Sequence, residues 1–392
     1  MVCMKKVFLT FFSVCLISFF HCVTGVARAQ DITLMPTLDI GGEYNDNATF
    51  TRTNKIDDFI TTISPALTFD YATELLNLES TIAVDFLRYA DERDLNTENQ
   101  KYAFNGDYRI TERWRVLGNF SYIEDTTLES ELEETGFVNV RQDRKRYNAG
   151  GGMSYQVSEL SDIGVNYAYM KTDYDFKGNV DYDSDAITLS YDRQLGNQLD
   201  VFTAQPYWLR LDSRINKADS YGLSFGWSHR FSETLSLKAF LGGRYTKIEP
   251  KDGRQSDETW GVVTDINLRK TGETTSASIS YSRNIYNSAE GEPIEVNRFY
   301  CDVRRMVIGR LGVRFSGNLY FTKAEGKFSA EDRTYFELIP SLYYKLTENH
   351  SLQLAYSYSQ EYDKTLTKDR EAERNRVWIS LNLRFPRKLN RR

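Results

Sequence analysis

The C-terminal stretch of the chain alternates between apolar and polar residues. From Val377 to Phe385 every second residue is Val, Ile, Leu or Phe, and the residues between them are Trp, Ser, Asn and Arg. The stretch from Leu352 to Ser359 repeats the alternation. Successive side chains of a β-strand point to opposite faces, so a period of two predicts strands with one apolar and one polar face.

The composition indicates what surrounds those two faces. The 392 residues include 26 Tyr and 23 Phe, yet only 41% are hydrophobic and the mean hydropathy is −0.52. A soluble protein of this length would contain longer apolar runs for a deep core, whereas apolar residues are here spread over alternate positions. Strands that face lipid on one side and water on the other need this distribution. The sequence therefore predicts an all-β fold, a transmembrane antiparallel up-and-down β-barrel.

Turn signals set the number of strands. Short signals such as Thr271-Gly272-Glu273 recur at steps of 37 to 47 residues, the length of one β-hairpin and a following loop. Nine long polar connections alternate with eight such turns, which predicts about eighteen strands. The strands are expected at 34–45, 59–70, 76–89, 101–110, 114–124, 146–157, 163–171, 186–193, 201–211, 221–231, 235–245, 260–269, 276–286, 294–303, 311–321, 334–344, 352–362 and 376–385.

Two prolines bear on this count and on how the barrel closes. Pro206 interrupts the pattern of 201–211, so it is expected at a bulge or where its missing N–H is harmless, and sixteen strands is the alternative. The last strand, 376–385, is expected to pair with 34–45 so that no edge remains in lipid. Pro386 is expected to end that pairing.

The N-terminus carries the pattern of a secretory signal peptide. Lys5 and Lys6 precede the apolar run 7–20, and Ala27-Arg28-Ala29 forms a small-x-small cleavage site. We expect a signal peptide at 1–29, the barrel at 30–385 and a basic periplasmic tail at 386–392; a single-pass anchor is the alternative for the first segment. Of the four cysteines only Cys301 lies outside the signal, so an internal disulfide is excluded.

The net charge argues against a nucleic-acid partner, and the strand alternation places several cations inside the barrel. Removal of the three basic signal residues changes the formal charge from −6 to −6 − 3 = −9, which argues against a nucleic-acid partner. If the apolar face of each strand meets lipid, the opposite face lines the lumen. The expected pore-lining residues are Arg109, Arg146, Lys238, Arg244, Arg269, Arg298, Arg304, Arg314 and Arg376.

These cations allow two interpretations. Charges on facing strands pair across a barrel and keep a polar interior ordered without selecting a solute. Alternatively, guanidinium groups in excess of acids form a ladder for an anionic or hydroxyl-rich solute. Aromatic residues near strand ends are expected to form an interfacial girdle: Tyr44, Trp114, Trp260, Tyr286 and Tyr344.

Residues for catalysis or for a cofactor are sparse. His229 and His350 have no Ser or Asp partner in a recognisable nucleophilic arrangement, and with one Cys they provide no metal-ligand spacing. Asp212 and Asp219 leave a weak calcium site open. The chain is therefore expected not to be an enzyme and to need no metal or cofactor.

The first two strands carry a family resemblance. The stretch from Leu34 to Asn47 and the stretch from Asp57 to Leu67 resemble the β-barrel porin family found with bacterial exopolysaccharide and exosortase gene clusters. The matching positions are Pro36, Glu43, Tyr44, Asn45, Asn47, Ile63, Ser64 and Pro65. The resemblance implies a protein of the Gram-negative outer membrane that serves polysaccharide export or general permeability.

Three functions follow from these observations. The first is a porin-like channel for an anionic solute or an exported exopolysaccharide, with its short turns and both termini in the periplasm. Its partners would be outer-membrane lipid, the solute and the barrel-assembly machinery. The second is a structural or adhesive barrel with a blocked pore. The third is a surface enzyme, for which the sequence offers no catalytic group.

Overall fold

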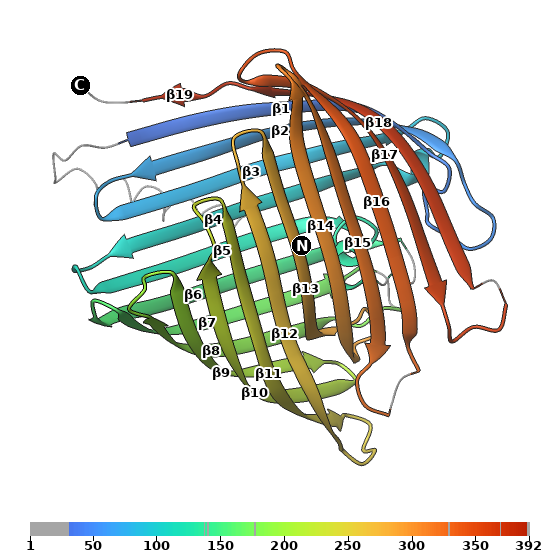
Figure 1. Cartoon of the computed structure of the whole chain (residues 1–392). Helices are drawn as coiled ribbons and strands as arrows, with labels where there is room; N and C mark the ends of the chain where they lie inside the picture. Colours follow the sequence, from blue (N-terminus) through green and yellow to red (C-terminus); the bar gives the residue numbers. More distant parts are fainter. Residues whose placement is uncertain are drawn as a thin grey trace, which may run out of the picture.

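The computed structural model describes residues 31–389 except 137, 139–140, 176–177, 328–329 and 369. The expected signal peptide and the last three residues of the expected tail lie outside this part. Eighteen long antiparallel strands follow one another around a single closed sheet (Figure 1). They are β1 Asp31–Asn45, β2 Asp58–Ala72, β3 Leu76–Tyr89, β4 Thr97–Arg109, β5 Trp114–Thr126, β6 Asp143–Ser158, β7 Ser161–Tyr174, β8 Tyr182–Gln194, β9 Asp200–Ser213, β10 Asn216–Arg230, β11 Leu235–Pro250, β12 Asp257–Thr271, β13 Thr275–Asn287, β14 Pro293–Ile308, β15 Leu311–Ala324, β16 Asp332–Lys345, β17 His350–Asp363 and β18 Glu371–Arg384.

The closed barrel confirms the predicted fold class and decides for eighteen strands rather than sixteen. Short turns join β2 to β3 and each later even-numbered strand to the next. Most of the other connections are longer, but only residues 214 and 215 join β9 to β10, so one of the nine long connections predicted from the sequence is a tight turn. We call the two ends of the barrel the short-turn end and the long-loop end. Two short helices lie in the long connections, η2 Arg93–Leu95 and α2 Glu131–Thr135.

The last strand closes the barrel as predicted. β18 pairs antiparallel with β1, with Tyr44 opposite Val377 and Leu38 opposite Leu383. The prediction that Pro386 ends this pairing is wrong, because a two-residue strand, β19 Arg387–Lys388, continues along Thr33 and Leu34. Proline removes only its own N–H, so the residues on either side can still bond to β1.

Prolines within the wall each interrupt one ladder only. Pro206 keeps its place opposite Leu223 of β10, while the pairing of β9 with β8 skips residues 205 and 206. Pro65 and Pro340 sit at equivalent gaps, in β2 toward β3 and in β16 toward β17. The missing N–H of Pro206 therefore points toward an interrupted ladder, which is the harmless placement expected from the sequence.

The outer face of the barrel is apolar. Val377 and Ile379 are about half exposed on it, and so are most large apolar side chains of the other strands. Tyr44, Trp114, Trp260 and Tyr344 are exposed near strand ends on this face, and Trp260 reaches 82% exposure. None of the helices within the described residues is both long and apolar enough to cross a membrane.

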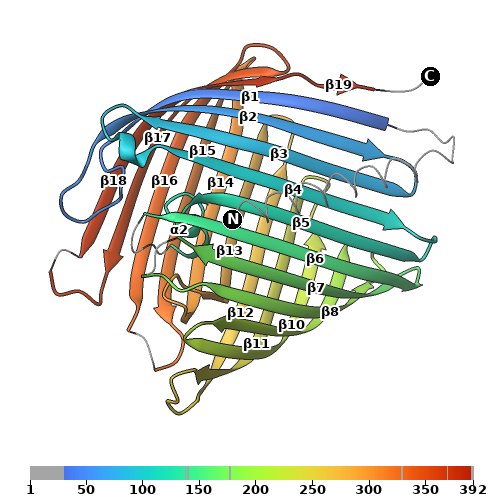
Figure 2. The ribbon, with the colours of Figure 1, turned by 180° about the vertical axis from the view of Figure 1, so that it is seen from behind.

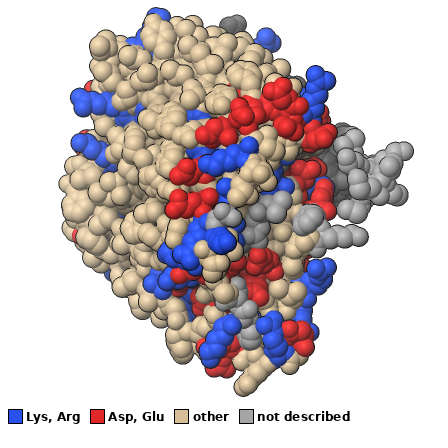
Figure 3. Space-filling model, turned by 90° about the vertical axis from the view of Figure 1, so that its right-hand side faces the viewer, with Lys and Arg blue, Asp and Glu red and all other residues tan. Residues whose placement is uncertain are grey.

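The apolar core of the protein lies inside the barrel, at the long-loop end. The largest cluster joins the β5–β6 connection to the walls and consists of Phe50, Leu128, Leu132, Val138, Ile294, Val296, Tyr320, Tyr335 and Ala372. Seen from behind, α2 lies within the ring of strands (Figure 2). Charged side chains gather over this end of the molecule, whereas the flank beside it is mostly uncharged (Figure 3).

Candidate functional site

The connection between β5 and β6, residues 127–142, folds into the lumen in its described part, 127–136, 138 and 141–142. Its helix α2 ends at Gly136, whose φ of 65° is left-handed and whose N–H donates to the Leu132 carbonyl at 2.9 Å. Glycine adopts this conformation without strain and satisfies an open carbonyl of the helix end. The left-handed turn at Gly136 therefore ends the helix.

Hydrogen bonds hold this connection against the opposite wall. The Tyr320 hydroxyl donates to the Glu133 carbonyl, and the Thr322 hydroxyl donates to the Thr135 carbonyl at 2.6 Å. Arg333 of β16 donates to the Val138 carbonyl at 3.3 Å. The connection therefore spans the barrel from β5–β6 to β15–β16 and narrows its long-loop end.

A buried ion cluster holds the near side of the connection. Arg144 of β6 is fully buried, and its guanidinium lies 3.7–3.8 Å from carboxylate oxygens of Asp125, Glu131 and Glu134. Glu134 also pairs with Arg146, and the Tyr174 hydroxyl donates to Glu131 at 3.0 Å. Burial raises the pKa of the Glu131 carboxyl to about 7, and burial likewise raises the pKa of Glu129 to about 7.

A second element enters the lumen at the tip of the β13–β14 hairpin. The ladder between β12 and β13 ends at Thr264 and Arg283, after which the hairpin leaves the wall. Ile285 then packs with Leu211, Ala218 and Ile248 on the inner faces of β9 to β11. The hairpin tip therefore lies inside the mouth of the barrel.

This bend corrects the prediction for Tyr286. Tyr286 pairs with Ile294, and Ile294 is fully buried in the cluster that contains Leu132 of the β5–β6 connection. The residue therefore faces the interior and is not part of the girdle. The prediction rested only on the position of this aromatic residue near a strand end, because the alternation of β13, with Ile279 on the outer face, gives Tyr286 the inward parity.

Four of the nine expected pore-lining cations form ion pairs. Arg146 pairs with Glu134 and Arg376 with Glu337, while Arg314 pairs with Asp302 at 2.6 Å. Arg244 is fully buried between Glu295 at 3.5 Å and Glu325 at 3.2 Å. For these four the charge-pairing interpretation applies, and two of the acids, Glu134 and Glu325, lie in connections rather than on strands.

The other five contact neutral groups or lie beside like charges. Arg298 donates to Asn318 at 2.9 Å and lies over Tyr320, Lys238 lies over Phe240, and Arg304 lies over Tyr343. Arg269 lies between Ser236 and Ser278 on the neighbouring strands. Arg109 lies opposite Arg115 across β4 and β5.

Two pairs of arginines face each other across neighbouring strands. Arg304 of β14 is directly opposite Arg314 of β15, and Arg109 of β4 is directly opposite Arg115 of β5. Within the described residues each pair has one carboxylate partner, Asp302 for Arg314 and Asp107 for Arg115. Both pairs lie toward the short-turn end, on opposite sides of the ring of strands. Like charges in direct opposition are destabilising unless an anion lies between them.

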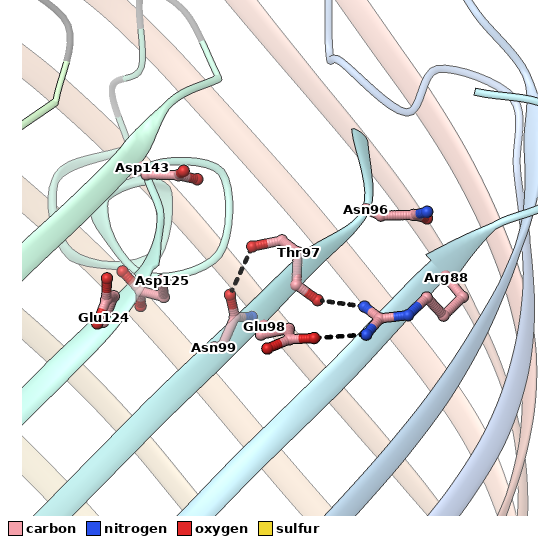
Figure 4. Close-up of a pocket in the computed structure, with 8 residues that line it drawn as sticks. All are labelled: Arg88, Asn96, Thr97, Glu98, Asn99, Glu124, Asp125 and Asp143. Atoms are coloured by element: carbon pink, nitrogen blue, oxygen red, sulfur yellow. Dashed lines mark hydrogen bonds and ion pairs between the residues drawn. The ribbon is translucent and has the colours of Figure 1, made fainter. Parts of the chain in front are cut away.

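Two cavities lie at the long-loop end. The larger, of about 500 Å³, is lined by Arg88, Asn96, Thr97, Glu98, Asn99, Glu124, Asp125 and Asp143 (Figure 4). Its Arg88 already pairs with Glu98 at 2.6 Å and donates to the Thr97 carbonyl at 3.2 Å. The smaller, of about 190 Å³, lies between the inward connection and β1–β3 and β16–β18, with Arg374 and Arg376 in its lining.

The structure does not bring the two expected histidines together. His229 lies on β10, where its Nδ1 is 2.6 Å from Asp200, and His350 lies on β17 against Phe385. Asp219 pairs with Arg210 at 2.8 Å, and Asp212 pairs with Lys251 at 2.5 Å. The two carboxylates therefore do not converge on a shared calcium position. Within the residues that the structure describes, no group of three or more His, Cys, Asp or Glu forms a metal site.

Sequence reasoning missed Arg144, Arg115 and Arg374. Arg144 has the same parity in β6 as the expected Arg146, and Arg374 has the same parity in β18 as Arg376. Extending the alternation by one more pair of residues at the long-loop end would have found both. For Arg115 the alternation in β5 was the available signal, because Val116 and Phe120 mark the opposite face.

Comparisons with solved structures find other barrels. OccAB3 from Acinetobacter baumannii is 10% identical, over 91% of this chain and 99% of that chain, with a TM-score of 0.49. The outer membrane protein OpdK from Pseudomonas aeruginosa is 7% identical, over 90% and 99%, with a TM-score of 0.46. A BenF-like porin from Pseudomonas fluorescens Pf-5 is 10% identical, over 90% and 99%, with a TM-score of 0.46.

Sequence comparison matches a family model over part of the chain. The comparison with curated proteins gives no match. Residues 27–136 match the model of the family described as "Putative beta-barrel porin 2". This segment contains both stretches on which the sequence resemblance rests, together with α2. Over residues 27–136 the match confirms the resemblance to a β-barrel porin family, and the described part of the chain folds as a closed antiparallel β-barrel.

Proposed function

We propose that this protein is an outer-membrane channel that passes small anionic solutes. The observation that carries the proposal is the direct opposition of Arg304 to Arg314, together with that of Arg109 to Arg115 on the other side of the ring. Each pair has an excess of one positive charge over its aspartate, so a passing carboxylate or phosphate would stabilise both. The short turns and both termini would then lie in the periplasm, as in bacterial barrels generally.

The inward connection favours a small solute over a polymer. Residues 127–142 cross the lumen and are hydrogen-bonded to Tyr320 and Thr322, so a polysaccharide chain would need the connection to leave this position. A small anion needs a smaller opening. Export of an exopolysaccharide, which the family resemblance implies as an alternative to general permeability, would therefore proceed through an undocked form of the connection.

A second candidate is a structural or adhesive barrel with a blocked pore. It is favoured by the apolar cluster around Leu132, Ile294 and Tyr320, which packs inside the long-loop end. Solute uptake separates the two candidates. If the barrel is blocked, proteoliposomes will take up neither anionic nor neutral small solutes at any pH.

The test of the channel compares anion uptake between matched variants. Proteoliposomes with the unmodified protein should take up a small carboxylate faster than a neutral sugar of similar size. Replacing Arg298, Arg304 and Arg314 with Ser should remove most of this preference. Arg254→Ser, which removes an exposed charge from the β11–β12 connection, should leave it unchanged. Equal uptake of both solutes by the unmodified protein would overturn the proposal.

A further inference from the structure

Arg374 of β18 is a buried cation without a charged partner. Its side chain is among the least exposed, at 5%. Among the described residues its guanidinium has no ion pair or hydrogen bond, and its Nε is fully buried without a partner. Its nearest stabilising contact is the ring of Phe50, whose centroid is 4.7 Å from the guanidinium carbon. A cation–π contact offsets only part of the hydration free energy that a buried guanidinium loses.

Neighbouring acids are already engaged with other donors. Glu337 is buried, and one of its oxygens accepts from Ser357, Ser359 and Arg376, the last at 3.0 Å. Glu43 accepts from the Asn45 amide at 3.2 Å. The site thus has a cation that needs an anion, and carboxylates whose remaining lone pairs can accept further hydrogen bonds.

The cavity of about 190 Å³ adjoins Arg374. Its charged lining combines Arg141, Arg374 and Arg376 with the carboxyl groups of Glu43, Glu129, Glu133 and Glu337, and Arg141 already donates to the Leu95 carbonyl at 2.9 Å. Tyr89 and Tyr335 contribute aromatic surface, and Ile60, Leu87 and Leu128 contribute apolar surface. The volume lies below the roughly 300–1,000 Å³ of sites for drug-sized ligands, which limits an occupant to about one sugar ring.

These groups select one class of ligand. A carboxylate matches the unpartnered guanidinium, hydroxyl groups match the surrounding acceptors, and a compact carbon skeleton matches the aromatic and apolar wall. Acetate would satisfy only the first requirement and a neutral sugar only the other two. We propose that this cavity binds a sugar acid of monosaccharide size, with its carboxylate on Arg374 and its hydroxyl groups toward Glu43, Glu133 and Glu337.

The proposal deepens the channel function and rests on it, because it names the class of anion that the narrowed mouth would capture. The two remain separable in experiment. Binding at Arg374 is measured on purified protein without transport, whereas anion preference is assigned to Arg304, Arg314 and their counterparts near the other end. An Arg374 variant that loses sugar-acid binding should keep its preference for anions over neutral solutes.

The test is isothermal titration of the full detergent-solubilised protein with glucuronate, glucose, acetate and glycine. Glucuronate should bind, and each of the other three at least tenfold more weakly. Arg374→Met should weaken glucuronate binding at least tenfold, and Arg254→Met, on an exposed connection, should not change it. Equal glucuronate binding by Arg374→Met and the unmodified protein would overturn the assignment, and so would comparable binding of glucose, acetate or glycine.

Thermal unfolding checks that the variant is folded and that Arg374 is unpartnered. Without ligand, Arg374→Met should unfold at a temperature equal to or above that of the unmodified protein, because an apolar side chain replaces an unpaired buried charge. Added glucuronate should raise the unfolding temperature of the unmodified protein only. A lower unfolding temperature for the ligand-free variant would contradict the claim that Arg374 lacks a partner.

Discussion

Thr322 of β15 donates a hydrogen bond of 2.6 Å to the backbone carbonyl of Thr135, which belongs to a connection rooted on the opposite side of the barrel. Two residues away, Tyr320 makes the equivalent bond to the Glu133 carbonyl. These side chains tie residues 127–142 to the far wall. The opening of the barrel therefore depends on a few contacts that mutation can remove without altering the strands.

Removing both donors should favour the undocked connection. We expect Tyr320→Phe combined with Thr322→Val to cost about 2 kcal/mol of docking free energy, an about thirtyfold shift toward the open form. Single-channel recording should show a larger mean conductance. Tyr344→Phe, on the outer face, is the matched control and should behave like the unmodified protein. An unchanged conductance in the double variant would show that docking does not limit the opening.

Gly136 provides a second test of the docked connection. Its φ of 65° is strained for alanine, and an added Cβ would collide with the Tyr320 side chain. Gly136→Ala should therefore destabilise docking by more than the roughly 1–2 kcal/mol of the left-handed conformation alone. Gly253→Ala isolates that conformational cost, because Gly253 has a φ of 85° and no atom within 4 Å of the added Cβ. Protease cleavage within 127–142 should accelerate only in Gly136→Ala; equal rates would contradict the predicted collision.

Docking should weaken as pH rises from about 4.5 to 7. Burial raises the pKa of Glu129 and Glu131 from 4.5 to about 7, so the docked connection holds protons that the undocked one releases. The docked state therefore loses stability between these two values, on the order of 3 kcal/mol for each carboxyl, and changes little above pH 7. Conductance should be higher at pH 8 than at pH 5, and Glu129→Gln with Glu131→Gln should flatten the dependence. A higher conductance at pH 5 would contradict this sign.

Replacing Arg244 with Met should lower the stability of the protein, whereas replacing Arg374 with Met should not. Arg244 is buried against Glu295 and Glu325, so Arg244→Met leaves Glu325 without its cation, whereas Glu295 keeps its ion pair with Arg283 at 2.8 Å. We expect a loss of about 3–5 kcal/mol in the free energy of unfolding, measured by denaturant unfolding in detergent. Arg254→Met is again the exposed control. A stability equal to that of the unmodified protein would show that these ion pairs do not hold the β13–β14 tip.

Much of the barrel wall could be predicted from the sequence, because the two faces of each strand follow from the alternation of neighbouring residues. The alternation from Val377 to Phe385 fixes which face meets lipid, and the pairing of β18 with β1 follows from the need to leave no edge. Most long and short connections were also correctly separated, but the connection between β9 and β10 was predicted to be long and has only two residues. Pro386 was misjudged because a residue after proline can resume the ladder.

The contents of the lumen could be predicted only in part. Alternation identifies which cations face inward, but it cannot show that Glu134, Glu295 and Glu325 come from elements that turn into the barrel and pair with them. Tyr286 was misassigned for a different reason, because its position near a strand end was given more weight than its inward parity in β13. Which connection enters the lumen depends on contacts between residues far apart in sequence, such as Leu132 with Ile294.

The reversal potential of the unmodified protein in a planar bilayer, under a gradient of potassium chloride, tests the channel account most directly. Arg304 opposite Arg314 and Arg109 opposite Arg115 predict a sign that corresponds to chloride crossing faster than potassium. A reversal potential of the opposite sign, or the absence of any conductance at both pH 5 and pH 8, would contradict it.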